Sequence, residues 1–212
     1  MSRPWESEGR RNQKRRTHAA LVAAARDLVA ANLLPGALEL LSPALAAEAD
    51  WVLAARFVGT DAAVQADVRR LASVGELEWL PLPADRTAAF WSTAGRGCLG
   101  GPITLRLGVL GDGVDETIDL LAHDLDEGLV SAGAGQGMIR WTGDTMPERL
   151  RALRRAAAAR EIPMTIERAP WAVRRALGHF GAYREWVGQI VGRLRETFDP
   201  GQCLNVALEG AD

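Results

Sequence analysis

Arg106 has the setting in this sequence that most clearly points to chemistry. It lies within the apolar run ITLRLGVL, which starts at Ile103 and is typical of a β-strand. A guanidinium among apolar residues needs an acceptor, because a buried charge without a partner is costly. Two interpretations stay open. Either Arg106 pairs with a carboxylate of its own domain, or it faces a site that receives an anion.

The three histidines are scattered along the chain, and no cysteine or carboxylate stands at a metal-ligand spacing around them. No metal site is therefore predicted. His123 lies in the acidic stretch AHDLDE and is expected to be solvated. His179 lies in LGHFGAY, a glycine-flanked joint between two predicted helices. A structural role for His179 is favoured, and a catalytic base is the alternative that makes it a candidate site residue beside Arg106.

Other reactive arrangements receive less support. The glycines of SAGAGQG, at 133, 135 and 137, precede MIRW, which has the pattern of a strand. A dinucleotide-binding loop needs a helix in that place, because the helix amides hold the pyrophosphate. A hairpin turn is therefore predicted. No serine occupies a nucleophile elbow. Cys98, in the predicted mobile loop GRGCLGGP, is a candidate exposed thiol.

The elements that must position these residues alternate between helix and strand. Periodicity and capping predict an α+β fold, with an antiparallel sheet and helices packed on one face in the ferredoxin-like style. The last helix is expected to turn Trp186, Ile190 and Leu194 inward, or else Val187 and Val191. The predicted helices cover residues 17–31, 60–75, a short stretch from 85, 114–128, 147–161, 170–177 and 182–198. The predicted strands cover residues 37–42, 51–59, 77–82, 103–110, 129–135, 137–143 and 162–170.

Composition narrows the class of protein. The chain has 212 residues, of which 48% are hydrophobic, and can bury a sizeable core. Its net charge of -2 gives no reason to expect nucleic acid as a partner. Two cysteines make no disulfide framework, and no apolar run is long enough to cross a membrane. A cytoplasmic globular protein is therefore expected.

The first sixteen residues differ from the rest. They are polar and densely basic, and they include Lys14, the only lysine of the chain. Such a run is typical of a solvated, disordered arm, and a docking arm for an acidic partner or a membrane surface is the alternative. The sequence thus divides into an arm over 1–16, a domain over 17–197 and a tail over 198–212.

The tail gives the strongest hint of family. RETFDPGQCLNVALEG places Phe198, Leu204 and Asn205 directly after an amphipathic helix. It resembles the FDP-x-G-x-LNPG signature that ends FAD-linked oxidases of the vanillyl-alcohol-oxidase/PCMH superfamily. The likeness covers about residues 17–208 and is greatest to the small FAD-binding subunit of glycolate oxidase. The further matching segments, in order, are PGALELLSP, VGTDAAVQADVRRL, AFWSTAGRG, PITLRLGVL and GQGMIRW.

This resemblance implies a particular domain arrangement. Such oxidases join an FAD-binding domain to an α+β cap domain that closes over the flavin and shapes the substrate pocket. The chain is similar to the cap and tail alone. The resemblance implies that Arg106 lies near a substrate carboxylate, and that Phe198, Leu204 and Asn205 face the flavin. FAD would be shared with, or supplied by, a missing domain or partner chain.

The function expected from the resemblance is that of a cap or substrate-domain subunit, or fragment, of a flavin-linked oxidoreductase. Its substrate would be a small 2-hydroxy acid such as glycolate, whose α-carbon gives a hydride to the flavin. The alternative is a degenerate, non-catalytic cap that acts as a small-molecule-binding or assembly module. A homo-oligomer is compatible with both.

Overall fold

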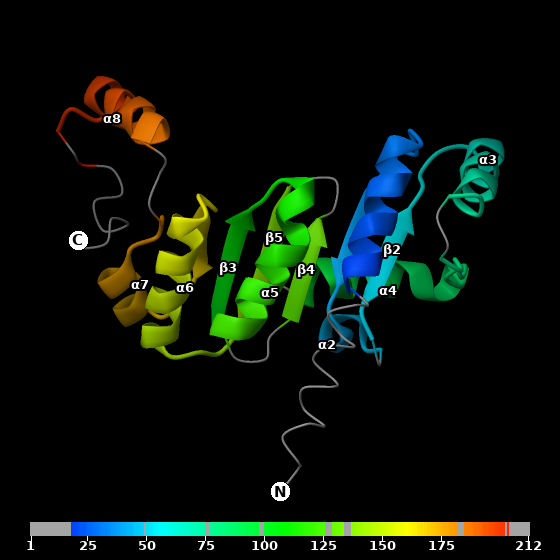
Figure 1. The fold of residues 1–212 in the computed structure, drawn as a ribbon, viewed down its shortest axis with the longest axis horizontal. Helices are drawn as coiled ribbons and strands as arrows, with labels where there is room; N and C mark the ends of the chain where they lie inside the picture. The colour runs from blue at the N-terminus through cyan, green and yellow to red at the C-terminus, as the bar shows by residue number, and fades with distance from the viewer. Residues whose placement is uncertain are drawn as a thin grey trace, which may run out of the picture.

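The computed structural model describes residues 18–48, 50–74, 77–97, 100–125, 129–133, 137–181, 185–201 and 203. The predicted arm over 1–16 lies outside the described residues, and so do Cys98, Leu204 and Asn205. Figure 1 shows a twisted sheet running through the middle of the molecule with helices before and behind it.

The sheet has six strands in the spatial order β2-β1-β4-β5-β3-β6, and every neighbouring pair is antiparallel. The fold is therefore α+β with an antiparallel sheet, as predicted. The strands are β1 (Ala37–Leu41), β2 (Val52–Arg56), β3 (Ile103–Gly108), β4 (Leu129–Gly133), β5 (Met138–Gly143) and β6 (Met164–Arg168).

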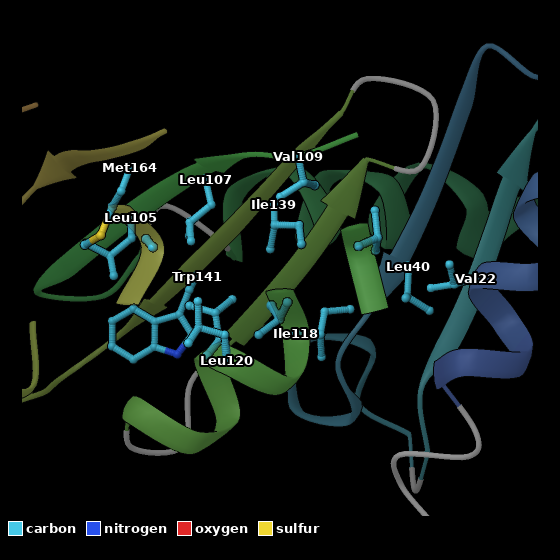
Figure 2. Close-up of a cluster of buried hydrophobic side chains, with 14 of the residues drawn as sticks. Val22, Leu40, Leu105, Leu107, Val109, Ile118, Leu120, Ile139, Trp141 and Met164 are labelled. Atoms are coloured by element: carbon cyan, nitrogen blue, oxygen red, sulfur yellow. The ribbon is translucent and has the colours of Figure 1, made fainter. Parts of the chain in front are cut away.

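Four of these strands form one continuous unit with two helices, in the chain order β3-α5-β4-β5-α6-β6. Successive strand residues point to opposite faces, so Leu105 and Leu107 of β3 lie on the same face as Ile139 and Trp141 of β5. These four side chains are almost fully buried. Helices α5 (Val114–Asp124) and α6 (Pro147–Ala159) cover them. Figure 2 shows Trp141, Leu105 and Ile139 in this core, with Ile118 and Leu120 of α5.

The N-terminal hairpin of β1 and β2 extends this unit past β4. The backbone N–H of Ser42 donates to the carbonyl of Val130, and the Val130 N–H donates to Ser42 Oγ, both at 2.9 Å. The helix over residues 18–30 packs on the same face as α5, and Leu28 and Leu40 join the main core.

Helices lie on both faces of the sheet, so the prediction of helices on one face alone is wrong. Leu41 follows Leu40 on β1 and therefore points to the opposite face. There it forms a second cluster with Leu45 of α2 (Pro43–Ala46) and Ala94 of α4 (Ala84–Gly97). Figure 1 shows both helices behind the sheet. Since β1 is apolar at successive positions, it can support a core on each side.

Two predicted boundaries also differ. Residues 77–82 form no strand, because Pro81 and Pro83 lack the N–H donors that a strand ladder needs, and Leu80 is exposed. The sequence predicts a loop that begins at Gly95, but helix α4 continues through Gly95 to Gly97. Between β2 and α4, helix α3 (Asp61–Leu71) begins as predicted. Its N-cap Thr60 accepts a hydrogen bond from the N–H of Ala63 at 3.4 Å.

The last two helices are α7 (Trp171–Leu177) and α8 (Glu185–Phe198). Figure 1 shows α8 standing apart from the sheet, beyond α7. No residue of α8 is buried. Trp186, Ile190 and Leu194 are 60%, 49% and 52% exposed, so the prediction that they point inward is wrong, whereas the alternative residues Val187 and Val191 are half-buried. Their spacing of four residues gives α8 an apolar stripe that nothing in the described part of the chain covers.

Candidate anion-binding site

Arg106 lies on the sheet face opposite to α5 and α6. It alternates with Leu105 and Leu107, which are buried beneath those helices, so its own side chain points the other way. That side chain is 44% exposed. The expectation of a buried guanidinium is therefore wrong. The apolar run correctly predicted a strand. Because side chains alternate along it, however, Arg106 points to the sheet face that α5 and α6 do not cover.

A second arginine stands directly beside the first. Arg140 of β5 is the register partner of Arg106 on β3, so two guanidinium groups share one cross-strand pair. Like charges in such a pair destabilise a sheet unless a counter-charge lies between them. Glu167 of β6 provides it. Its Oε1 lies 3.1 Å from Nε of Arg106, and its Oε2 accepts from Nε of Arg140, also at 3.1 Å.

A β-bulge places Glu167 between the arginines. Thr104 of β3 pairs with Arg168 and Leu105 pairs with Ile166, so Glu167 is an extra residue without a partner on β3. Bulges commonly redirect one side chain in this way. Neither Arg140 nor Glu167 was selected from the sequence. Their link to Arg106 depends on the register of three strands, and no local sequence signal reports it.

The trio carries one net positive charge on an accessible face. Arg106 makes an ion pair with Glu167 through Nε, and Arg140 donates its Nε–H to the same carboxylate; within the described residues neither side chain makes a further hydrogen bond. The terminal N–H groups of a guanidinium can still hold a planar carboxylate through two parallel hydrogen bonds. Both interpretations of Arg106 thus have a structural basis, since it pairs internally and also retains donors for an anion.

The structure does not join His179 to this trio. Phe180 forms a bridge with Thr165 of β6, and Thr165 pairs in turn with Arg106, so β6 separates His179 from the arginine. The His179 carbonyl accepts from the N–H of Ile166 at 2.8 Å. Its ring packs edge-on against Phe180, with centroids 4.4 Å apart. No described contact joins the His179 side chain to Arg106.

Of the predicted flavin-facing residues, only Phe198 is described. It ends α8 and is 75% exposed. The FDPG turn that follows has a clear local basis, because Asp199 Oδ1 accepts from the N–H of Cys203 at 2.8 Å. This hydrogen bond explains why an aspartate stands at position 199. The ring of Phe198 takes no part in the turn and remains exposed to solvent.

Histidine 18 has partners that sequence spacing did not suggest. It is buried, and its ring packs edge-on against Trp51 at 5.6 Å. Its Nδ1 lies 2.5 Å from Asp115 Oδ1, and its Nε2 lies 3.5 Å from Asp119 Oδ1, both on α5. These contacts tie the N-terminal helix to α5. His123, in contrast, is exposed as predicted, and among the described residues its side chain has a polar contact with its neighbour Asp124 alone.

Strands β4 and β5, which end at Gly133 and begin at Met138, pair antiparallel as the predicted hairpin, and residues 134–136 lie outside the described residues. Gly137 has φ of 62°, and an added Cβ would lie 2.6 Å from the carbonyl oxygen of Val109. It therefore needs the left-handed backbone that glycine adopts easily. Strand β5 begins immediately afterwards, at Met138. A strand follows Gly137, so the described part of this segment offers no helix N-terminus to the pyrophosphate of FAD.

The sequence matches no protein-family model and no curated protein. The likeness to FAD-linked oxidases therefore rests on the motifs given above. Within the described residues, no helix combines the length and apolar character needed to cross a membrane.

Proposed function

We propose that this chain is the cap, or substrate-domain, subunit or fragment of a flavin-linked oxidoreductase that acts on a small 2-hydroxy acid such as glycolate. The observation that carries the proposal is the Arg106–Glu167–Arg140 trio on the open face of the sheet. An oxidoreductase cap needs a cationic group that orients the substrate carboxylate. The trio offers two guanidinium groups with one carboxylate between them.

In this proposal the role of the trio is binding and orientation. Glu167 holds both arginines by Nε, which fixes the planes of the two guanidinium groups before substrate arrives. The substrate carboxylate accepts from the terminal N–H groups of Arg106, with Arg140 adding to the positive potential. His179 has no part in this step, because β6 lies between it and Arg106.

The flavin belongs to a partner in this proposal, since the described residues form no cradle for its pyrophosphate. Two features support the cap assignment. The unit β3-α5-β4-β5-α6-β6 has the chain order of ferredoxin-like domains, with the spatial order β4-β5-β3-β6. The exposed stripe of α8, formed by Trp186, Ile190, Leu194 and Phe198, is an apolar surface suited to a flavin-binding domain or subunit.

The alternative is a non-catalytic cap that serves assembly or binds a small molecule without turnover. One observation favours it. The ion pairs of Glu167 already give each arginine a partner, and a purely structural trio needs nothing more. In that case the stripe of α8 would bind another copy of the chain.

The partner proposal predicts a change of colour on assembly. The isolated chain should purify without flavin absorbance, whereas co-expression with its flavin-binding partner should give a yellow complex with about one FAD per pair. Ile190→Asp should abolish the complex, because a carboxylate in the middle of the stripe cannot be buried without a counter-charge. Absorption spectra and size-exclusion chromatography measure both effects.

The matched control is Gln189→Asp, which puts the same charge on an exposed neighbouring position of α8. It should leave the complex intact. A yellow isolated chain with one FAD per molecule would refute the supply of flavin by a partner. An Ile190→Asp variant that assembles normally would exclude the stripe as the docking surface.

A further inference from the structure

An apolar cavity of about 280 Å³ lies between the N-terminal helix, β1 and the start of α5. Its base is formed by Val22 of the helix, Leu40 of β1 and Val114 of α5, and all three side chains are buried. Figure 2 shows Val22 and Leu40 pointing toward each other at one end of the buried cluster. No side chain of the described residues fills this space, although protein interiors are normally packed without voids of such a size.

The sequence of the N-terminal helix explains why the cavity exists. Leu21, Ala25 and Val29 are spaced by four residues, so they share one face of the helix, and all three line the cavity. Ala25 is 4% exposed, and its methyl group leaves open the space that a larger side chain would fill. Val29 is 50% exposed. The cavity is therefore closed at its base and open to solvent beside Val29.

The size and the lining of the cavity suit a ligand with an aliphatic chain. An apolar cavity of about 150 Å³ can bind benzene, so one of about 280 Å³ accommodates roughly ten non-hydrogen atoms. Seven of the eight residues that line it have apolar side chains. Water forms few hydrogen bonds in such a space, and an aliphatic chain that displaces it gains the free energy of apolar burial.

The eighth lining residue is Arg26. It is exposed, so its aliphatic stem can lie along the apolar wall while the guanidinium stays at the mouth of the cavity. Arg26 has a partner within the chain, but a guanidinium has five N–H groups and can hold a carboxylate at the same time. A ligand whose chain fills the cavity would thus bring an anionic head group to Arg26.

We infer that this cavity binds an aliphatic carboxylate of roughly eight carbons, with its chain against Ala25 and its carboxylate on Arg26. Such an acid has the number of non-hydrogen atoms that the volume accommodates, and its single negative charge matches the single cationic residue of the lining. The cavity lies on the sheet face that α5 covers, opposite to Arg106, so the inference does not depend on the proposed flavin-linked activity.

Three probes separate the contributions of the chain and the head group. Octanoate carries both. The alcohol 1-octanol keeps the chain and lacks the charge, whereas butanoate keeps the carboxylate and lacks most of the chain. Each is titrated into the full chain of the protein, and calorimetry gives Kd while thermal melting gives Tm.

Matched variants test the position of the site. Ala25→Phe fills the cavity, and Val29→Trp obstructs its mouth. Val68→Trp, at a valine of α3 that is 43% exposed, is the control for the second of these. Arg26→Met removes the guanidinium, and Arg69→Met makes the same change at an exposed position of α3 that does not line the cavity.

Octanoate should bind saturably and raise Tm, and 1-octanol and butanoate should each bind at least tenfold more weakly. Ala25→Phe and Val29→Trp should each raise the Kd of octanoate at least tenfold, while Val68→Trp and Arg69→Met stay within about twofold of the wild type. Arg26→Met should weaken octanoate about tenfold and leave 1-octanol unchanged, because only the acid uses the guanidinium.

The inference is overturned if octanoate shows no saturable binding, if 1-octanol binds as tightly as octanoate, or if Arg69→Met lowers the affinity as much as Arg26→Met. Should Ala25→Phe fail to fold, Val29→Trp still decides the question, because Val29 is half exposed and its replacement leaves the core intact. A Val29→Trp variant that binds octanoate with the wild-type Kd would also overturn it.

Discussion

Replacing Trp141 by alanine should lower the free energy of unfolding by about 3–5 kcal/mol, the usual range for a fully buried aromatic residue. Trp141 is 2% exposed and lies in β5 between Val130 of β4 and Leu105 of β3. Figure 2 shows its ring among the buried side chains, toward one side of the cluster. The large loss follows because the packed neighbours cannot collapse fully into the space of an indole ring.

The matched control is Trp171→Ala on α7, where the side chain is 58% exposed. It should change the free energy of unfolding by less than about 1 kcal/mol, because a surface substitution leaves no cavity. Urea unfolding followed by far-ultraviolet circular dichroism compares the variants without relying on tryptophan fluorescence. Equal losses for the two variants would contradict the assignment of Trp141 to the centre of the core.

The second large effect concerns turnover. In the proposed complex with a flavin-binding partner, Arg106→Lys should lower kcat/KM for a small 2-hydroxy acid at least tenfold, which corresponds to about 1.4 kcal/mol of transition-state binding. The compact ammonium of lysine cannot make two parallel hydrogen bonds to a carboxylate. Steady-state kinetics with glycolate measures the change. Arg56→Lys, the same replacement at an exposed position of β2, is the control and should leave kcat/KM unchanged.

Stability distinguishes this role from a purely structural one. Because Arg106 is nearly half exposed, its ion pair with Glu167 should contribute no more than about 1 kcal/mol to folding. Arg106→Ala should therefore stay folded while the complex loses activity. If Arg106→Lys keeps full turnover, the trio is a structural element of the sheet, and the non-catalytic cap becomes the better account of the chain.

Most of the fold could be predicted from the sequence, because strong periodicity reports burial directly. The alternation around Leu105 and Leu107 predicts β3, and the capping and spacing of α5 and α6 predict both helices within a few residues. The failures that concern burial share one cause. Periodicity shows that a face is apolar, but it does not show which surface, if any, covers it. Trp186 and Ile190 of α8 are therefore exposed although their spacing is that of a buried face.

The candidate site was predictable only in part. Arg106 stands out as a charge within an apolar strand, a signal that is visible in the sequence. Its relation to Arg140 and Glu167 requires the register of β5 and β6 on β3 and a bulge one residue long.

The hydrogen bonds between Ser42 and Val130 have a consequence for the order of assembly. They join residues 88 positions apart, whereas the paired strand residues of the unit from Ile103 to Arg168 are at most 64 positions apart, as between Thr104 and Arg168. The entropy lost on closing a loop grows with its length, and contacts between distant residues slow folding. The C-terminal unit should thus gain protection against hydrogen exchange first during refolding. The N-terminal hairpin then completes the sheet by adding to an edge that is already formed.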